Sequence, residues 1–235
     1  MSFYSMKTVS CKKKLNVVNF DLLTENKQRK RHGVLFPDTV RGLIIGPSGV
    51  GKTNLLLSLL IHPNGLRFEN IYIYSKSTNQ PKYQLLDKIM NGIKEVSYIV
   101  FTNNEDVIQP CEAKRNSVFI FDDVICEKQQ NIKEYFARGR HYACDTFFLA
   151  QTYSAVSKQL IRDNTNFLCI FQQDLRNLKH IFNDHVTDIS FEKFKEMCQH
   201  CWKSSKHGFI VIDKESNLQN GRYRNGLDSF FIDIK

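Results

Sequence analysis

A glycine-rich segment of eight residues constrains this chain most, because its chemistry requires a strand before it and a helix after it. Residues 46–53 fit the pattern G-x-x-x-x-G-K-[ST], in which backbone N–H groups and a helix N-terminus cradle phosphate. The apolar run 40–45 is typical of a buried strand, and the stretch 54–61 is typical of a helix. We therefore predict a phosphate-binding loop formed by Gly46, Pro47, Ser48, Gly49, Val50, Gly51, Lys52 and Thr53.

The last two residues of this loop predict its ligands. The Lys52 ammonium is expected to reach the β- and γ-phosphates of ATP, and the Thr53 hydroxyl to bind Mg²⁺. A chance glycine turn is the alternative, but the correct flanks on both sides argue against it. ATP and Mg²⁺ are therefore the predicted cofactors.

The bulk composition is that of a soluble globular protein. A length of 235 residues suits one α/β domain with short extensions, and 42% of the residues are hydrophobic and 24% charged. The longest apolar stretch is far too short to span a membrane, and residues 1–10 lack the apolar core of a signal peptide. We expect no membrane span and an intracellular protein whose seven cysteines are reduced.

The net charge of +9 is concentrated at the N-terminus. Residues 1–40 hold eight Lys or Arg against three acids, and the densest cluster is 27–32. This cluster predicts either contact with nucleic-acid phosphates or a nuclear-import signal, while a solvated basic tail explains it equally well. We divide the chain into a basic N-terminal arm or cap, 1–39, and a phosphate-loop domain, 40–235.

The rest of the chain alternates predicted strands and helices. The strands are continuous apolar runs, which is typical of strands buried on both faces of a parallel sheet. We therefore predict a three-layer α/β fold of the P-loop NTPase (RecA/ASCE-like) class, with a mostly parallel central sheet. The predicted strands are 40–45, 70–74, 97–101, 117–121, 146–150, 167–171 and 208–212, and the predicted helices are 54–61, 84–90, 130–140, 156–163, 174–182 and 189–202.

Two polar positions at strand ends complete the predicted site. Asp122 and Asp123 follow a buried strand, where one carboxylate can hold Mg²⁺ and the next can activate water. A helix N-cap is the alternative for either, but the phosphate-binding loop favours the metal. Gln151 closes the following strand, where it can sense the γ-phosphate or position water, unless it is only a solvent-facing loop residue.

Two arginines lie between these strands. Arg138 or Arg140 could stabilise the transferring phosphoryl group of a neighbouring subunit. An arginine at a helix end also complements the helix dipole, and spacing alone does not choose between these roles.

These segments together resemble the FtsK/HerA branch of P-loop ATPases. The resemblance rests on the Asp-Asp pair, on Ala137-Arg138-Gly139-Arg140-His141, on the strand ending at Gln151, and on residues 161–164 before the strand 167–171. Within this branch, the short chain, Phe-Asp-Asp and Gly-Arg-His are similar to the genome-packaging ATPases of poxvirus-like large DNA viruses. Virophages and Polinton/Maverick-type transposons carry similar versions. The resemblance covers residues 40–213.

The resemblance implies a homo-oligomeric ring ATPase, expected to be a hexamer, that pumps double-stranded DNA into a capsid. It implies a capsid or portal-site protein as partner, and a location in the host nucleus, at a cytoplasmic assembly site or with the virion. By position, Asp122 becomes the Mg²⁺ acid and Gln151 the polar sensor. Asp123 replaces the wider family's catalytic Glu with a side chain one methylene shorter. Arg140 matches the trans-acting arginine, with Arg138 its close rival.

DNA contact by such a motor requires basic loops that read only the backbone. The segments 124–131 and 152–158 follow the two strands that end at the acid pair and at Gln151. Either segment could line a pore, and the sequence does not choose between them.

A Cys-x-x-Cys pair raises the question of zinc. Cys198 and Cys201, together with His180 and His185, could supply four ligands. However, 189–202 has the pattern of an amphipathic helix, and reduced cysteines pack well in a core. With only one such pair in the chain, we favour packing.

Two other functions fit parts of the pattern. A zinc-containing nucleoside kinase of the thymidine-kinase type has a phosphate-binding loop at this length, but two Cys-x-x-Cys pairs and Asp-Glu where this chain has Asp-Asp. A non-motor NTP-binding switch, or a structural DNA-binding protein, would need neither Asp123 nor Gln151 nor a trans-acting arginine.

Overall fold

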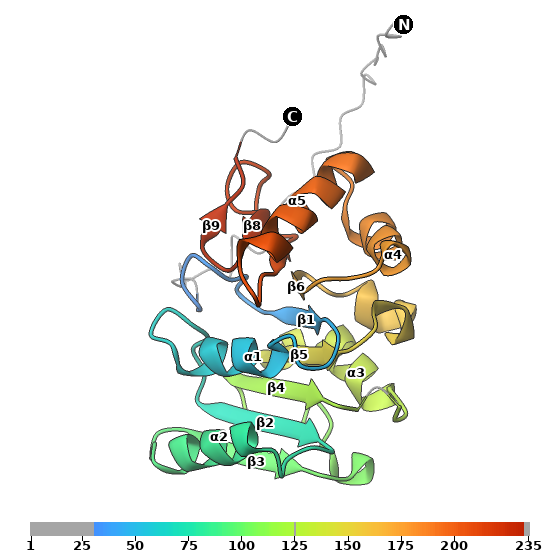
Figure 1. Ribbon diagram of the computed structural model, residues 1–235. Helices are drawn as coiled ribbons and strands as arrows, with labels where there is room; N and C mark the ends of the chain where they lie inside the picture. Colours follow the sequence, from blue (N-terminus) through green and yellow to red (C-terminus); the bar gives the residue numbers. More distant parts are fainter. Residues whose placement is uncertain (1–30, 125, 233–235) are drawn as a thin grey trace, which may run out of the picture.

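A single central sheet organises the protein. The computed structural model describes residues 31–124 and 126–232, and within them nine strands pair in the order β3-β2-β4-β5-β1-β6-β7-β8-β9 (Figure 1). All pairings among the first six strands in the chain are parallel: β1 (Arg41–Ile45), β2 (Asn70–Ser75), β3 (Ser97–Phe101), β4 (Ser117–Asp122), β5 (Cys144–Ala150) and β6 (Phe167–Ile170). The pairings of the last three are antiparallel: β7 (Ile210–Asp213), β8 (Tyr223–Asn225) and β9 (Ser229–Phe230). The mostly parallel sheet is confirmed.

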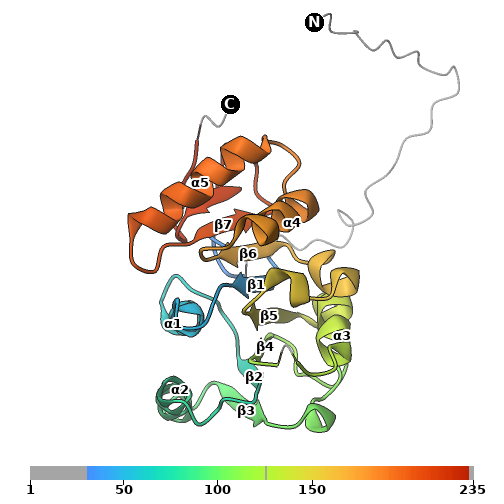
Figure 2. The same cartoon turned by 45° about the vertical axis from the view of Figure 1, so that its right-hand side comes forward.

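Helices cover both faces of this sheet and complete three layers (Figure 2). α1 (Lys52–Ile61) and α2 (Pro81–Asn91) share a core with the β1 side chain Ile44. α3 (Gln130–Arg138), α4 (Leu175–His185) and α5 (Phe191–Ser204) share the opposite core with Leu43 and Ile45. Consecutive strand residues alternate between the two cores, so both faces must be apolar, which explains the continuous apolar runs. The predicted three-layer α/β class is confirmed.

The helix predicted over 156–163 does not form. A short 3₁₀ turn (Tyr153–Ala155) and an irregular helical turn (Lys158–Arg162) occupy the connection instead, and the exposed Leu160 has φ +68°. The buried apolar residues Val156 and Ile161 are five positions apart. On a regular helix they would point about 140° apart, so one helix face could not bury both. The irregular backbone solves this conflict.

Sequence patterns also missed the terminal hairpin. β8 and β9 are too short to appear as apolar runs, but Asn225-Gly226, where β8 ends and the turn begins, is a recognised hairpin dipeptide. Gly226 has φ +69°, a conformation that favours glycine. That dipeptide was the available indication of the antiparallel edge.

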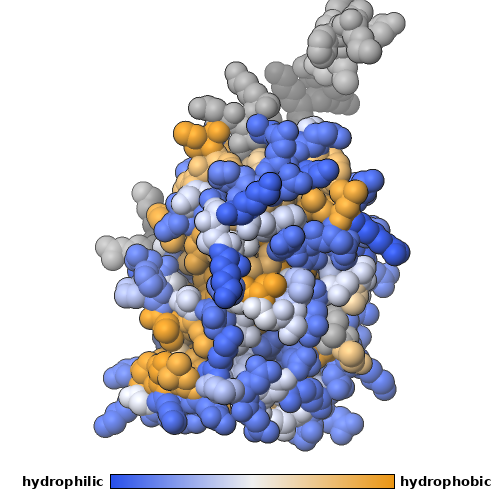
Figure 3. Space-filling view, viewed as in Figure 1, coloured by the Kyte–Doolittle hydropathy of each residue, from blue (hydrophilic) through white to orange (hydrophobic). Residues whose placement is uncertain are grey.

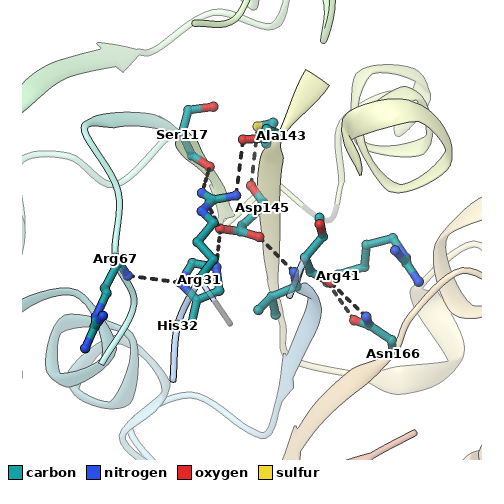
Figure 4. A network of polar contacts seen from close by, with 11 residues as sticks. Arg31, His32, Arg41, Arg67, Ser117, Ala143, Asp145 and Asn166 are labelled. Carbon is teal, nitrogen blue, oxygen red and sulfur yellow. Dashed lines mark hydrogen bonds and ion pairs between the residues drawn. The ribbon is translucent and has the colours of Figure 1, made fainter. Parts of the chain in front are cut away.

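The start of the described chain is joined to the sheet by a buried acid (Figure 4). The fully buried Asp145 of β5 lies 2.8 Å from an Arg31 nitrogen and 2.9 Å from Nε2 of His32. The Val40 N–H donates to its other oxygen at 2.8 Å. Arg31 and His32 are therefore not part of a solvated tail, whereas residues 27–30 of the basic cluster lie outside the described residues.

Residues 31–39 also contribute to the core. Phe36 is buried and packs on Phe167 with ring centroids 5.5 Å apart. The boundary predicted at residue 39 stays a prediction, although Arg31, His32 and Phe36 of the predicted arm pack on the domain.

The surface fits the composition. On the face that carries α1 and α2, apolar residues form separate areas among hydrophilic ones (Figure 3). In the described part of the chain, no helix has the length and apolar character needed to cross a bilayer. The six cysteines within that part are all free thiols.

Candidate active site

The order of the strands brings the predicted site together. β5 lies between β1 and β4, and its residues Leu149 and Ala150 pair with Asp122 and Ile45. The three strands are parallel, so their carboxyl ends meet at one edge of the sheet, where α/β proteins commonly bind ligands. The phosphate-binding loop, the acid pair and Gln151 follow these three ends. The sheet therefore gathers segments that are far apart in the sequence.

The glycines of the loop are required by its geometry. Gly49 has φ +79° and Gly51, just before α1, has φ +114°, conformations in which a side chain is strained. At Gly46 a β-carbon would lie 2.6 Å from the β-carbon of Phe171. The loop can thus curl tightly between β1 and the helix N-terminus, as a phosphate cradle requires.

Lys52 lies at the mouth of this loop. Its ammonium donates to the carbonyl oxygens of Gly46, at 2.6 Å, and Pro47, at 2.9 Å. Burial lowers the pKa of Lys52, and the nearby charges of Asp122 and Asp123 oppose that shift. The ammonium therefore lies between the loop and the two acids, where phosphate oxygens would exchange with the carbonyl groups.

Asp122 is a buried carboxylate held by a tyrosine. Its exposed fraction is 8%, and the Tyr83 hydroxyl of α2 donates to it at 2.5 Å. Burial raises the pKa of Asp122, while the hydrogen bond from Tyr83 opposes that shift. Burial also raises the pKa of Tyr83, which keeps the phenol protonated as a donor. Sequence patterns gave no indication of Tyr83, because only the fold places α2 beside the end of β4.

Asp123 has a different environment from its neighbour. Its backbone is left-handed, with φ +56°, and its side chain is exposed at the cleft. The Ser77 hydroxyl donates to its carboxylate. Ser77 follows β2, the neighbour of β4, so the chain from the end of β2 into α2 supplies a donor to each acid. Residues with a rare backbone conformation, such as Asp123, often occur at functional sites.

One cleft of about 320 Å³ joins these groups. Gln151 lines this cleft, where the sequence predicted it, whereas the lining residues Gln80, just before α2, and Lys82, in α2, were not predicted. Lys82 adds a second cation to the cleft. The lining residues are Ser48, Gly49, Gly51, Lys52, Thr53, Gln80, Lys82, Asp122, Asp123, Leu149 and Gln151.

The oxygen atoms of this cleft fit Mg²⁺. Mg²⁺ typically uses one or two protein oxygens together with phosphates and water, so Thr53 and Asp122 would suffice. No three His, Cys, Asp or Glu side chains of residues 31–124 and 126–232 gather as a full protein metal cage would require.

The Cys-x-x-Cys pair does not face a metal site. Cys198 and Cys201 are buried in the core under α5. His185 contacts the Tyr153 hydroxyl through Nε2, and His207 lies beside the phosphate-binding loop. The predicted core packing of the two cysteines is confirmed, which weakens the zinc-dependent kinase alternative.

Arg138 and Arg140 do not line the cleft of their own chain. Arg138 is largely exposed and lies 3.4 Å from Glu134, and the exposed Arg140 is in the turn before β5. Its charge acts on Arg41, the first residue of β1. The phosphate-binding loop follows the other end of this five-residue strand, about 16 Å away. Neither arginine lines the cleft of its own chain, and the trans-acting role stays a prediction.

Comparison with solved structures supports this fold. The chain is similar to the genome packaging NTPase B204 from Sulfolobus turreted icosahedral virus 2 in complex with sulfate, at 15% identity and TM-score 0.54, over 76% of this chain and 93% of that one. The B204 complex with AMPPCP has 14% sequence identity to this chain and a TM-score of 0.51, over 75% of this chain and 93% of that one. B204, the DNA-packaging ATPase from Sulfolobus Turreted Icosahedral Virus, has 17% sequence identity to this chain and a TM-score of 0.50, over 73% of this chain and 91% of that one. At such identities the likeness shows the fold alone.

Comparison of the sequence identifies the family. No curated protein matches the chain. The family model of the poxvirus A32 protein matches residues 26–230. That match covers most of the chain and confirms the resemblance inferred from the motifs. The chain belongs to the poxvirus A32 protein family.

Proposed function

We propose that this protein is a Mg²⁺-dependent ATPase that drives double-stranded DNA into a capsid. The observation that carries the proposal is the convergence of Lys52, Thr53, Asp122, Asp123 and Gln151 on one cleft. Membership of the A32 family supports it, as does the likeness in fold to a packaging NTPase whose structures contain AMP and AMPPCP.

Binding of ATP would use groups that are already in place. The N–H groups of the loop and the start of α1 offer donors to the β- and γ-phosphates. Lys52 would exchange its two carbonyl partners for phosphate oxygens. These donors are preorganised, so they can stabilise negative charge that grows during phosphoryl transfer.

Hydrolysis would divide the work among four residues. Thr53 and Asp122 would hold Mg²⁺, which when bound neutralises charge on the phosphates. Asp123 would accept the proton of the attacking water on its carboxylate, which Ser77 holds in place through one oxygen. Gln151, on the neighbouring strand end, would position the water or sense the γ-phosphate.

Movement of DNA would require assembly. We propose a homo-oligomeric ring, hexameric by analogy with FtsK/HerA ATPases, in which Arg140 or Arg138 reaches the cleft of the next subunit. The net charge of +9 favours DNA, because each phosphate contact releases counterions without reading sequence. The segments 124–131 and 152–158 follow β4 and β5 and remain the candidates for DNA contact, although residue 125 lies outside the described residues. A capsid or portal-site protein would dock the ring in the nucleus, at a cytoplasmic assembly site or on the virion.

The test is the steady-state ATPase rate of the purified protein with and without linear double-stranded DNA. We expect DNA of unrelated sequences to stimulate hydrolysis equally, and Lys52→Ala to abolish it. An ATPase rate that DNA does not change would contradict the DNA-motor function but would still support an ATPase. Phosphate transfer to a nucleoside, without hydrolysis, would instead establish a kinase.

A further inference from the structure

A second groove adjoins the phosphate cradle on the side away from the acid pair. Its volume is about 390 Å³, and Gly51 lines both this groove and the cleft. One wall is the outer face of α1, and the other is formed by the segments around β6, β7 and the β8–β9 turn. The lining residues are Gly51, Asn54, Leu55, Ser58, Phe171, His207, Phe209, Gly226, Leu227 and Asp228.

Hydrogen bonds hold the far wall in place. The turn after α5 descends toward the start of α1 (Figure 1), and there the His207 ring donates from Nδ1 to the Val50 carbonyl at 2.8 Å. The Gly226 N–H donates to the Phe209 carbonyl at 3.0 Å. The groove is therefore joined directly to the phosphate-binding loop.

A buried ion pair fixes the β8–β9 turn. Arg224, 1% exposed, lies 2.6 Å from the Asp213 carboxylate and donates to the Leu227 carbonyl at 3.4 Å. A buried charged pair with several hydrogen bonds resists rearrangement, because moving either partner leaves the other uncompensated. The wall that carries Leu227 is thus formed before any ligand binds.

The positions of the acid pair and Gln151 decide which part of a bound nucleotide would face the groove. Asp122, Asp123 and Gln151 follow β4 and β5, so the γ-phosphate end of a nucleotide would face that side. The groove lies on the other side of β1, toward β6 and β7. The remainder of the nucleotide must leave the cradle on the side opposite the γ-phosphate, which is where the groove begins.

We propose that this groove, the base groove, receives the ribose and purine base of the nucleotide. The inference rests on the proposed ATPase function and deepens it. Phe171, Phe209 and Leu227 supply apolar surface for a flat ring, and Asn54 and Ser58 supply polar groups at the rim. Mostly apolar walls with a few polar groups are typical of sites for small organic ligands.

Asp228 gives the groove a chemical preference. An ionised carboxylate only accepts hydrogen bonds, so it favours a base that presents an amine. Purines with an exocyclic amine meet this requirement. We expect Asp228→Asn to change the ratio of affinities for ATP and GTP more than it changes affinity for inorganic tripolyphosphate.

The test compares ligands with and without a nucleoside. Calorimetry would measure the binding of Mg-ATP and of Mg-tripolyphosphate to the full chain. Leu227→Gln should weaken ATP binding about tenfold, equivalent to about 1.4 kcal/mol, and leave tripolyphosphate binding unchanged. The matched control is Leu175→Gln, which changes an exposed leucine of α4 and should alter neither. Photolabelling with 8-azido-ATP should modify the peptides that carry the groove residues.

Each outcome separates the two proposals. Unchanged ATP binding by Leu227→Gln with photolabel outside the groove would overturn the base groove. An equal loss of ATP and tripolyphosphate binding would also overturn it, because the substitution would then act on the whole cradle. If the wild-type protein binds neither ligand while Lys52→Ala behaves identically, the ATPase proposal itself fails.

Discussion

At the scale of single residues, the two adjacent acids show how the backbone separates roles. Asp122 ends β4 inside the protein, whereas the left-handed turn at Asp123 places the next carboxylate in the cleft. Tyr83 and Ser77 each donate to one of them. Two carboxylates with different surroundings can perform different tasks, which in the proposed mechanism are metal binding and proton transfer.

Tyr83 should adjust the pKa of Asp122, the proposed Mg²⁺ ligand. Its hydrogen bond lowers the pKa of Asp122 against the larger raising effect of burial. Tyr83→Phe removes that bond, so Asp122 should remain protonated at higher pH and bind Mg²⁺ more weakly. We expect the acid limb of the pH–rate profile to move to higher pH, and the Mg²⁺ needed for half-maximal hydrolysis to rise about tenfold.

The control for this prediction is Tyr98→Phe, the same change on β3 outside the cleft. A profile and Mg²⁺ requirement that do not move in Tyr83→Phe would show that the hydrogen bond is only structural.

At the scale of elements, the connection from β5 to β6 is tied to α4. The Tyr153 hydroxyl donates to Asp184 at 2.7 Å and contacts Nε2 of His185 at 2.8 Å. Arg162 lies 2.8 Å from the same Asp184. The connection begins at Gln151, so these contacts join the end of β5 to the helix layer.

His185 makes this junction sensitive to acid. Burial lowers the pKa of His185 to about 3, below its usual value, so the fold favours the neutral ring. Its contribution to stability is complete above the ordinary histidine pKa, near 6.5, and is lost as pH falls from there toward 3. His185→Gln cannot be protonated, so its melting temperature should fall less between pH 7.5 and pH 5.

The matched control is His180→Gln, which changes an exposed histidine of the same helix and should melt like the wild type at both pH values. An equal fall in the wild type and in His185→Gln would show that His185 is not the acid-sensitive group.

The elements also show what the sequence could and could not predict. The phosphate-binding loop, the acid pair and Gln151 were predictable, because local patterns place polar residues directly after apolar strands. The strand order was not predictable from such patterns, so the contributions of Tyr83, Ser77 and Lys82 remained hidden. The β5–β6 connection was predicted as a helix, but burial of both Val156 and Ile161 requires an irregular backbone, which contacts with α4 hold in place.

At the scale of the whole molecule, the cleft and the two arginines lie at opposite ends of the strands. Asp145 binds Arg31 and His32 at the end that carries Arg140, and the Arg31 guanidinium also donates to the Ala143 carbonyl at 3.3 Å. The turn that presents Arg140 is thus supported by the N-terminal segment. This arrangement suits an arginine that acts on another subunit.

Mixing two inactive variants would test that role. Lys52→Ala keeps Arg140 but loses its own cleft, and Arg140→Ala keeps the cleft but loses the arginine. We expect each alone to hydrolyse no ATP, and mixed assemblies to recover part of the wild-type rate. Normal hydrolysis by Arg140→Ala alone would exclude Arg140 as the trans-acting arginine. If activity is recovered only when Arg138→Ala is mixed with Lys52→Ala, the role belongs to Arg138.

In the proposed ring, the placement of donor and acceptor at opposite ends of the strands also decides which surfaces meet. Each subunit would give its arginine to the cleft of the next, which makes a head-to-tail contact between two different surfaces. Such a contact leaves one unpaired surface at each end of the assembly until the repeated rotation completes a full turn and closes the ring. An assembly whose rotation failed to close would grow into an open helical filament, so closure of the proposed ring would depend on the rotation that relates neighbouring subunits.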